Sequence, residues 1–144
     1  MREEELIREA YEAKKAAYTP YSGFAVGAAL LTKSGKVYRG CNIENAAYSP
    51  TNCAERTAVF KAVSEGEKEF EAIAIVGDGD DYLSPCGVCR QVLAEFVQPE
   101  EFWVIMVGKD EDYRKSTLLE LFPSSFSKSS LETFYRKEID KKIT

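Results

Sequence analysis

Apolar residues along the chain change their spacing several times, and each spacing predicts a type of secondary structure. In residues 3–18 they recur every three or four positions, which is typical of a helix with one buried face. Short continuous apolar runs between turn signals predict buried strands. The predicted elements, in order, are a helix at 3–18, strands at 24–32 and 37–43, a helix at 53–66, a strand at 70–76, a helix at 86–97, a strand at 102–107 and a short helix or turn at 117–121. This order predicts an α/β fold, a three-layer α/β/α sandwich around a mixed sheet.

The chain has 144 residues, a length that fits one domain with a substantial core. Its last stretch differs from the rest, because it is strongly charged although Leu131, Phe134, Tyr135 and Ile139 recur at helical spacing. We therefore expect one domain over residues 1–131 and a charged tail over residues 132–144.

Charge and composition exclude several functions. The chain carries 24 acidic and 19 basic residues, a net charge of −5, and such a surface repels the phosphates of nucleic acids. No apolar run is long enough to cross a membrane, and the N-terminus is amphipathic rather than a signal peptide, so we expect a cytoplasmic protein with reduced thiols. There is no histidine, so a Ser-His or Cys-His catalytic pair is excluded and a metal site must use cysteine or carboxylate.

Three of the four cysteines are placed at predicted helix starts. Cys53 begins one helix, and Cys86 and Cys89 lie three apart at the start of the next, where they project from one face. Two helix N-termini directed at one point favour thiolates, and three protein ligands with an open fourth position are typical of catalytic zinc. The Cys86–Cys89 pair alone also fits a redox dithiol or half of a zinc ribbon. Cys41 lies within a strand pattern and is expected to be a buried free thiol.

Glu55 follows the first cysteine by two residues, and its sequence context allows two interpretations. It can reach a water at the open position of the metal and move protons there. Alternatively, Asn52 is a helix N-cap and Glu55 completes a capping box.

The sequence Cys-Ala-Glu at 53–55, followed by Pro-Cys-Gly-Val-Cys at 85–89, matches the zinc deaminase signature with cysteine as the first ligand. On these motifs the chain resembles the small homotetrameric cytidine deaminases of pyrimidine salvage, over about residues 5–131. The resemblance implies a five-stranded sheet, a Zn²⁺ ion, and hydrolytic deamination of cytidine and 2′-deoxycytidine to the uridine forms with release of ammonia. It makes Glu55 the catalytic residue and Cys53, Cys86 and Cys89 the metal ligands.

The resemblance also implies roles for residues outside the two motifs. Arg56 would donate a hydrogen bond to the thiolates, and Phe24 would form a wall of the pyrimidine pocket. Asn42 and Glu44 would bind the ribose, and the Ala54 N–H would recognise the pyrimidine. Phe126 of a neighbouring subunit would form a lid over the base. Without the resemblance, Arg56 is a surface residue, Asn42 and Glu44 are turn residues, and Phe126 anchors a loop. The acidic segment 77–82 has no role in this comparison.

Two other functions fit parts of the sequence. One is deamination of a different aminopyrimidine nucleoside, such as a nucleoside antibiotic, and the ribose-binding pattern of Asn42 and Glu44 argues against it. The other is a zinc-stabilised binding module without catalysis. Glu55 and the open fourth zinc position argue against that second function.

Overall fold

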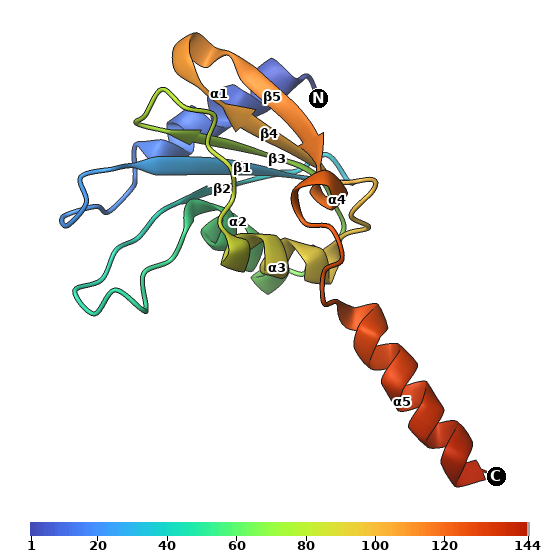
Figure 1. Cartoon of the computed structure of the whole chain (residues 1–144). Helices are drawn as coiled ribbons and strands as arrows, with labels where there is room; N and C mark the ends of the chain where they lie inside the picture. The colour runs from blue at the N-terminus through green and yellow to red at the C-terminus, as the bar shows by residue number, and fades with distance from the viewer. Residues whose placement is uncertain (144) are drawn as a thin grey trace.

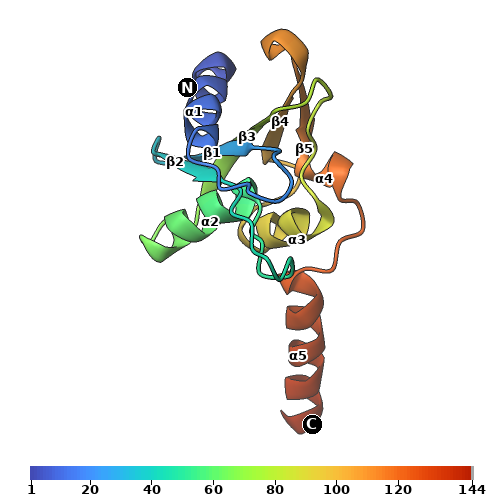
Figure 2. The same cartoon turned by 90° about the vertical axis from the view of Figure 1, so that its left-hand side faces the viewer.

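A mixed sheet of five strands forms the middle of the molecule, with α1 on one face and α2 and α3 on the other (Figures 1 and 2). The computed structural model describes residues 1–143, and Thr144, the last residue of the predicted tail, lies outside the described residues. The elements are α1 (Glu3–Lys14), β1 (Val26–Thr32), β2 (Val37–Cys41), α2 (Ala54–Ser64), β3 (Phe70–Gly77), α3 (Gly87–Phe96), β4 (Trp103–Val107), the 3₁₀ turn η1 (Lys109–Glu111), β5 (Tyr113–Thr117), α4 (Leu118–Leu121) and α5 (Lys128–Ile143). The predicted three-layer sandwich is confirmed.

The sheet has the order β2-β1-β3-β4-β5, in which only β3 and β4 are paired in parallel. Because β1 is antiparallel to both β2 and β3, the strands β2, β3 and β4 all run in one direction. The segments after β2 and β3, which lead to the two cysteine motifs, therefore leave the sheet at the same edge. In sheets of this kind ligand sites form at the carboxyl ends of the strands.

The pattern of apolar residues did not locate β5. This strand lies at the edge of the sheet and consists mainly of polar and charged residues, with Arg114 and Lys115 exposed. Charged edge strands are common because they prevent pairing with other chains, and they lack the alternation that identifies a half-buried strand.

Each face of the sheet has its own apolar core. Leu6, Ile7 and Ala10 of α1 pack on one face, and Ala58 of α2 and Leu93 of α3 pack on the other. The central strands β1 and β3 are buried on both faces, which explains their continuous apolar sequence.

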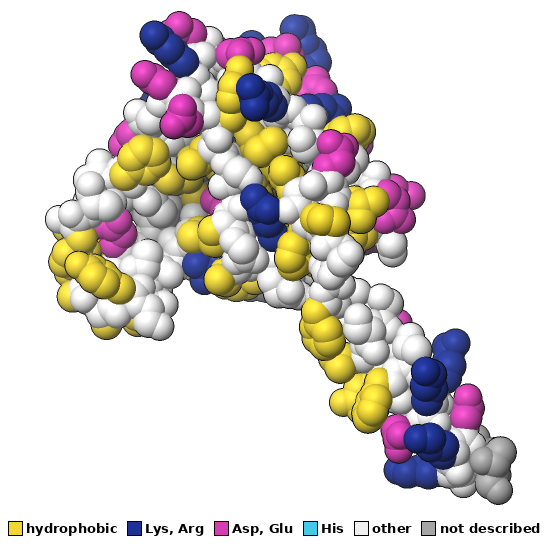
Figure 3. Space-filling model, in the orientation of Figure 1, with side chains coloured by type: hydrophobic (Ala, Val, Ile, Leu, Met, Phe, Trp, Pro, Cys, Tyr) yellow, Lys and Arg dark blue, Asp and Glu magenta, His cyan; other side chains and the backbone are white. Residues whose placement is uncertain are grey.

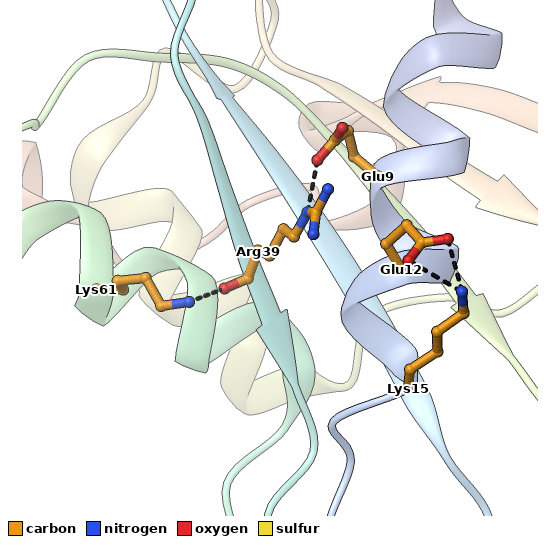
Figure 4. Close-up of polar contacts among 5 residues, drawn as sticks. All are labelled: Glu9, Glu12, Lys15, Arg39 and Lys61. Atoms are coloured by element: carbon orange, nitrogen blue, oxygen red, sulfur yellow. Dashed lines mark hydrogen bonds and ion pairs between the residues drawn. The ribbon is translucent and has the colours of Figure 1, made fainter.

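Arg39 of β2 joins the helices on the two sides of the sheet (Figure 4). Its Nε lies 2.6 Å from Glu9 Oε2 of α1, and its carbonyl accepts a hydrogen bond from Lys61 of α2. Glu12 and Lys15 form a further ion pair of 2.8 Å at the end of α1. Exposed pairs of this kind contribute about 0–1 kcal/mol each, so the apolar faces supply most of the attraction between layers.

A glycine brings the start of α2 against β2. A Cβ atom added at Gly40 would lie 2.3 Å from the Ala54 carbonyl oxygen and 2.5 Å from the Ala58 nitrogen, which are impossible contacts. Only glycine therefore allows the helix to approach this closely, and the approach places Cys53 beside the end of the strand.

Helix α5 extends away from the rest of the chain (Figures 1 and 2). It confirms the helical spacing predicted near the C-terminus and begins at Lys128, before the expected boundary at residue 131. The division into a domain and a tail stays a prediction. The apolar side chains at its spaced positions are exposed: Leu131, Phe134, Tyr135 and Ile139. Figure 3 shows hydrophobic side chains on the surface of this helix. Within residues 1–143, none of the helices combines the length and apolar character needed to cross a bilayer.

Candidate metal and catalytic site

Three thiols meet at the edge of the sheet. The Sγ atoms of Cys53, Cys86 and Cys89 all lie within 4.8 Å of one another, and those of Cys53 and Cys86 are 3.7 Å apart. Two sulfur ligands of a tetrahedral zinc ion, each about 2.3 Å from the metal, are separated by about 3.8 Å. The donor set therefore fits zinc, and Cys41, which is half-buried, lies outside the group.

Helix starts hold these thiols in place. Cys53 is the N-cap residue of α2 and Cys86 the N-cap residue of α3. The Cys86 Sγ accepts a hydrogen bond of 3.5 Å from the Cys89 N–H. Before α2, Ile43 and Asn52 exchange two backbone hydrogen bonds of 2.9 Å, which close the loop between them and place the next residue, Cys53, at the sheet edge. The partial positive charge of both helix ends favours thiolates.

Arg56 contacts the thiol group directly. Its Nη2 donates a hydrogen bond of 3.3 Å to Cys53 Sγ. Hydrogen bonds from the Cys89 thiol and from Arg56 outweigh the effect of burial and lower the pKa of Cys53 to about 5. These contacts favour the thiolate form of Cys53, the state that a metal ion requires.

The structure shows one positioning residue that the motifs did not reveal. Arg90 follows Cys89 and donates hydrogen bonds of 2.8 Å to the Pro85 carbonyl and to the Ser84 hydroxyl, and another to the Leu121 carbonyl. It thereby ties the turn before Cys86 to the end of α4. Its place directly after Cys89 is the only sequence signal, and spacing alone does not distinguish it from a surface arginine.

Glu55 is buried next to the thiols. Its exposure is 5%, and burial raises its pKa above the usual value. The capping-box interpretation is wrong, because the N-cap residue is Cys53 and makes no side-chain cap hydrogen bond. Asn52 instead donates to the Thr57 hydroxyl at 3.1 Å. A buried carboxyl group at the second position of α2, next to the thiols, is available for chemistry.

Asn42 holds the segment that carries Phe24. Its Oδ1 accepts from the Val26 N–H and its Nδ2 donates to the Phe24 carbonyl, both at 2.9 Å. The amide retains one N–H and further lone pairs for another partner. Phe24 itself is 38% exposed.

Glu44 lines an open cavity of about 380 Å³ together with Tyr48 and Thr51. Its carboxylate accepts backbone hydrogen bonds from Tyr21 at 3.0 Å and Ser22 at 3.1 Å, and another from the Ser22 hydroxyl. The hydrogen bonds from Ser22 hold the pKa of Glu44 below its usual value. The structure thus joins Phe24, Asn42 and Glu44 into a second group, built from the segments after α1 and β2.

The other two predicted residues lie as follows. Ala54 is fully buried at the first position of α2, where the N–H has no acceptor within the helix. Phe126 follows α4 with its side chain 62% exposed, while its carbonyl accepts a 2.8 Å hydrogen bond from Gln91 of α3. Most of the Phe126 ring is therefore uncovered by its own chain.

The chain is similar to known proteins over most of its length. Residues 1–106 match the family described as the cytidine and deoxycytidylate deaminase zinc-binding region. A cytidine deaminase of Sporosarcina psychrophila is 52% identical over 128 residues, covering 89% of this chain and 93% of that protein. A cytidine deaminase of Halalkalibacterium halodurans is 52% identical over 122 residues, covering 85% of this chain and 92% of the relative.

A solved structure has the same fold. The crystal structure of a cytidine deaminase from Burkholderia pseudomallei superposes with a TM-score of 0.84 at 46% identity, covering 88% of this chain and all of that one. The family match spans both cysteine motifs, and the three thiols that it contains are placed to hold a metal ion. The chain therefore belongs to the cytidine and deoxycytidylate deaminase family of zinc enzymes.

Proposed function

We propose that this chain catalyses the hydrolytic deamination of cytidine and 2′-deoxycytidine to uridine and 2′-deoxyuridine, releasing ammonia. One observation carries the proposal: a buried carboxyl group, Glu55, adjoins three thiols whose separations fit zinc. The relatives named above are cytidine deaminases, which supports the same substrate class.

The site residues divide the chemistry between them. Cys53, Cys86 and Cys89 would hold a zinc ion, which would supply a Lewis acid that lowers the pKa of water to about 7. Glu55 takes a proton from the attacking water and delivers it to N3 of the pyrimidine. It then takes the second proton, from the hydroxyl group now on C4, and delivers that proton to the departing amine. The water oxygen forms a bond to C4, the C4–N4 bond breaks, and ammonia leaves. Burial raises the pKa of Glu55 above its usual value, which makes the carboxylate a stronger base toward the attacking water.

The second group of residues recognises the nucleoside. Phe24 lines the pyrimidine pocket, and the Ala54 N–H donates to the pyrimidine. Asn42 and Glu44 bind the ribose 3′-hydroxyl with the hydrogen-bonding capacity that their contacts to the chain leave free. A nucleoside without that hydroxyl would leave these polar groups unpaired and would bind more weakly.

The direct test is turnover of cytidine. We expect purified protein to remove the cytidine absorbance band and release one ammonia for each nucleoside consumed. A pyrimidine nucleoside antibiotic is the comparison substrate, because it separates this activity from deamination of another aminopyrimidine. A zinc-loaded chain that leaves all these nucleosides unchanged would support the binding module instead.

We also propose a cytoplasmic homotetramer with shared active sites. The support for assembly is the exposed Phe126 ring, which its own chain leaves uncovered, on a segment fixed to α3 by Gln91. A lid from a neighbour would exclude water from a small site and strengthen its electrostatics. The support for location is the thiol group, since three reduced cysteines persist in a reducing compartment.

A mixing experiment tests the shared site. Phe126→Ala is expected to damage the site of an adjacent chain, whereas Glu55→Ala damages the site of its own chain. Co-refolding the two variants should therefore restore activity above the average of the two pure proteins. The recovered sites would combine Glu55 from one chain with Phe126 from the other.

The control is a mixture of Glu55→Ala with Glu55→Gln, in which both lesions affect the same position and no recovery is expected. Native mass spectrometry verifies that mixed oligomers form. If mixed oligomers are present and activity stays at the average, Phe126 acts within its own chain.

A further inference from the structure

The ring of Phe24 rests on a short stretch of the acidic segment that follows β3. A Cβ atom added at Gly77 would lie 3.1 and 3.2 Å from the ring atoms Cε1 and Cζ of Phe24, and one added at Gly79 would lie 3.4 and 3.5 Å from Cε2 and Cζ. The two glycines therefore leave the space that the ring uses. The residue between these two glycines is Asp78, which contacts the backbone of Ala25, the residue after Phe24.

Asp78 fixes the residue next to Phe24 by two hydrogen bonds. Its Oδ2 accepts from the Ala25 N–H at 2.8 Å, and its own N–H donates to the Ala25 carbonyl at 3.1 Å. Its other carboxylate oxygen, Oδ1, lies 2.8 Å from Lys14 Nζ at the end of α1. The lysine side chain is 24% exposed and the aspartate side chain 40%, so the pair is partly open to solvent.

We propose that Asp78 is a positioning residue for nucleoside binding, which holds Phe24 at the angle that the pyrimidine requires. This inference rests on the proposed function, since it assigns Phe24 to the pyrimidine pocket. Asn42 fixes the Phe24 carbonyl from one side, and Asp78, oriented by Lys14, fixes Ala25 from the other. Three segments distant in sequence thus set the orientation of one aromatic ring.

The expected effect is on KM rather than on kcat. Without the carboxylate the ring loses its fixed orientation, while the zinc ligands and Glu55 keep theirs. We expect Asp78→Ala to raise the KM for cytidine about three- to tenfold, the range of an aromatic contact, and to leave kcat within about twofold. Asp78→Asn retains an oxygen for the Ala25 N–H but loses the charge that attracts Lys14. Its KM should therefore lie between those of the wild type and Asp78→Ala.

A double-mutant cycle separates positioning from general stability. In a Phe24→Ala background, Asp78→Ala should change KM by less than about twofold, because the ring through which it acts is gone. Amide hydrogen exchange at Ala25 should be faster in Asp78→Ala than in the wild type. The matched control is Glu9→Ala, which removes the Arg39 pair of the same helix (Figure 4) and should leave KM and kcat unchanged.

Two results would overturn the inference: an unchanged KM in Asp78→Ala, or an equal rise in KM with and without Phe24. Either one, obtained with normal wild-type turnover, leaves the proposed function intact. A folded, zinc-loaded wild type that does not deaminate cytidine contradicts the proposed function itself, and with it the inference. Asp78→Asn provides the measurement if the alanine variant does not fold.

Discussion

Glu55→Gln is expected to lower kcat for cytidine by about 10²–10⁴-fold, the contribution of positioned proton transfer, while zinc content and fold are retained. Glutamine has nearly the same shape as glutamate but cannot accept the proton of the attacking water. Because glutamine preserves the shape of this buried side chain, which is 5% exposed, the substitution removes little that stabilises α2. The effect should therefore fall on turnover and leave KM and the melting temperature close to those of the wild type.

Steady-state kinetics, zinc analysis and thermal denaturation of the same preparation provide the measurement. The matched control is Glu65→Gln at the exposed end of the same helix, which should match the wild type in all three. A variant of Glu55 that keeps full turnover and only melts earlier would assign this carboxyl a structural role.

Removing one metal ligand is expected to have the second large effect. Wild-type protein should contain about one zinc ion per chain, and Cys86→Ala should lose both the metal and more than about 100-fold of the activity. Two thiolates cannot complete the site, and the free energy of metal binding that stabilises the fold is lost as well. The same is expected for Cys53→Ala and Cys89→Ala.

Cys41→Ala is the matched control, because this thiol is half-buried and lies outside the group. It should keep its zinc and its activity.

Arg56→Gln should have a zinc affinity between those of Cys41→Ala and the variants that lack a zinc ligand. We expect its affinity to be about 10–100-fold weaker than that of the wild type, because Cys53 loses its hydrogen-bond donor. Chelator competition gives the affinities, and full activity in protein shown to be free of metal would contradict the zinc mechanism.

Local sequence predicted most of this fold and failed where distant segments interact. The apolar spacing of the first helix continues to Tyr18, yet α1 ends at Lys14. Tyr18 instead pairs with the chain after β2, donating to the Asn42 carbonyl at 3.0 Å and accepting from the Glu44 N–H at 2.9 Å. Pairing with a distant segment therefore ends the helix before its apolar spacing ends. A pattern within one segment cannot reveal such pairing.

The candidate site shows the same division. The three cysteines could be grouped from sequence because each lies at a recognisable helix start, and their spacing is a local property. The contacts of Asp78 with Ala25 and Lys14 join segments more than fifty residues apart, and nothing in the acidic composition of its loop indicates them. The capping box failed for a related reason, since Asn52 pairs with Ile43 and bonds to Thr57.

The two groups of site residues come from separate stretches of chain, and this separation affects how such an enzyme can diversify. The thiols and Glu55 lie at the starts of α2 and α3, whereas Phe24, Asn42 and Glu44 lie in the segments after α1 and β2. On the proposed roles of these residues, mutations in those two segments would alter which nucleoside is accepted while the helix ends that carry the proposed reaction stay unchanged. Libraries for new substrates are therefore best confined to residues 19–25, Asn42 and residues 44–51, which leaves out Ile43 and Asn52, the pair that places Cys53.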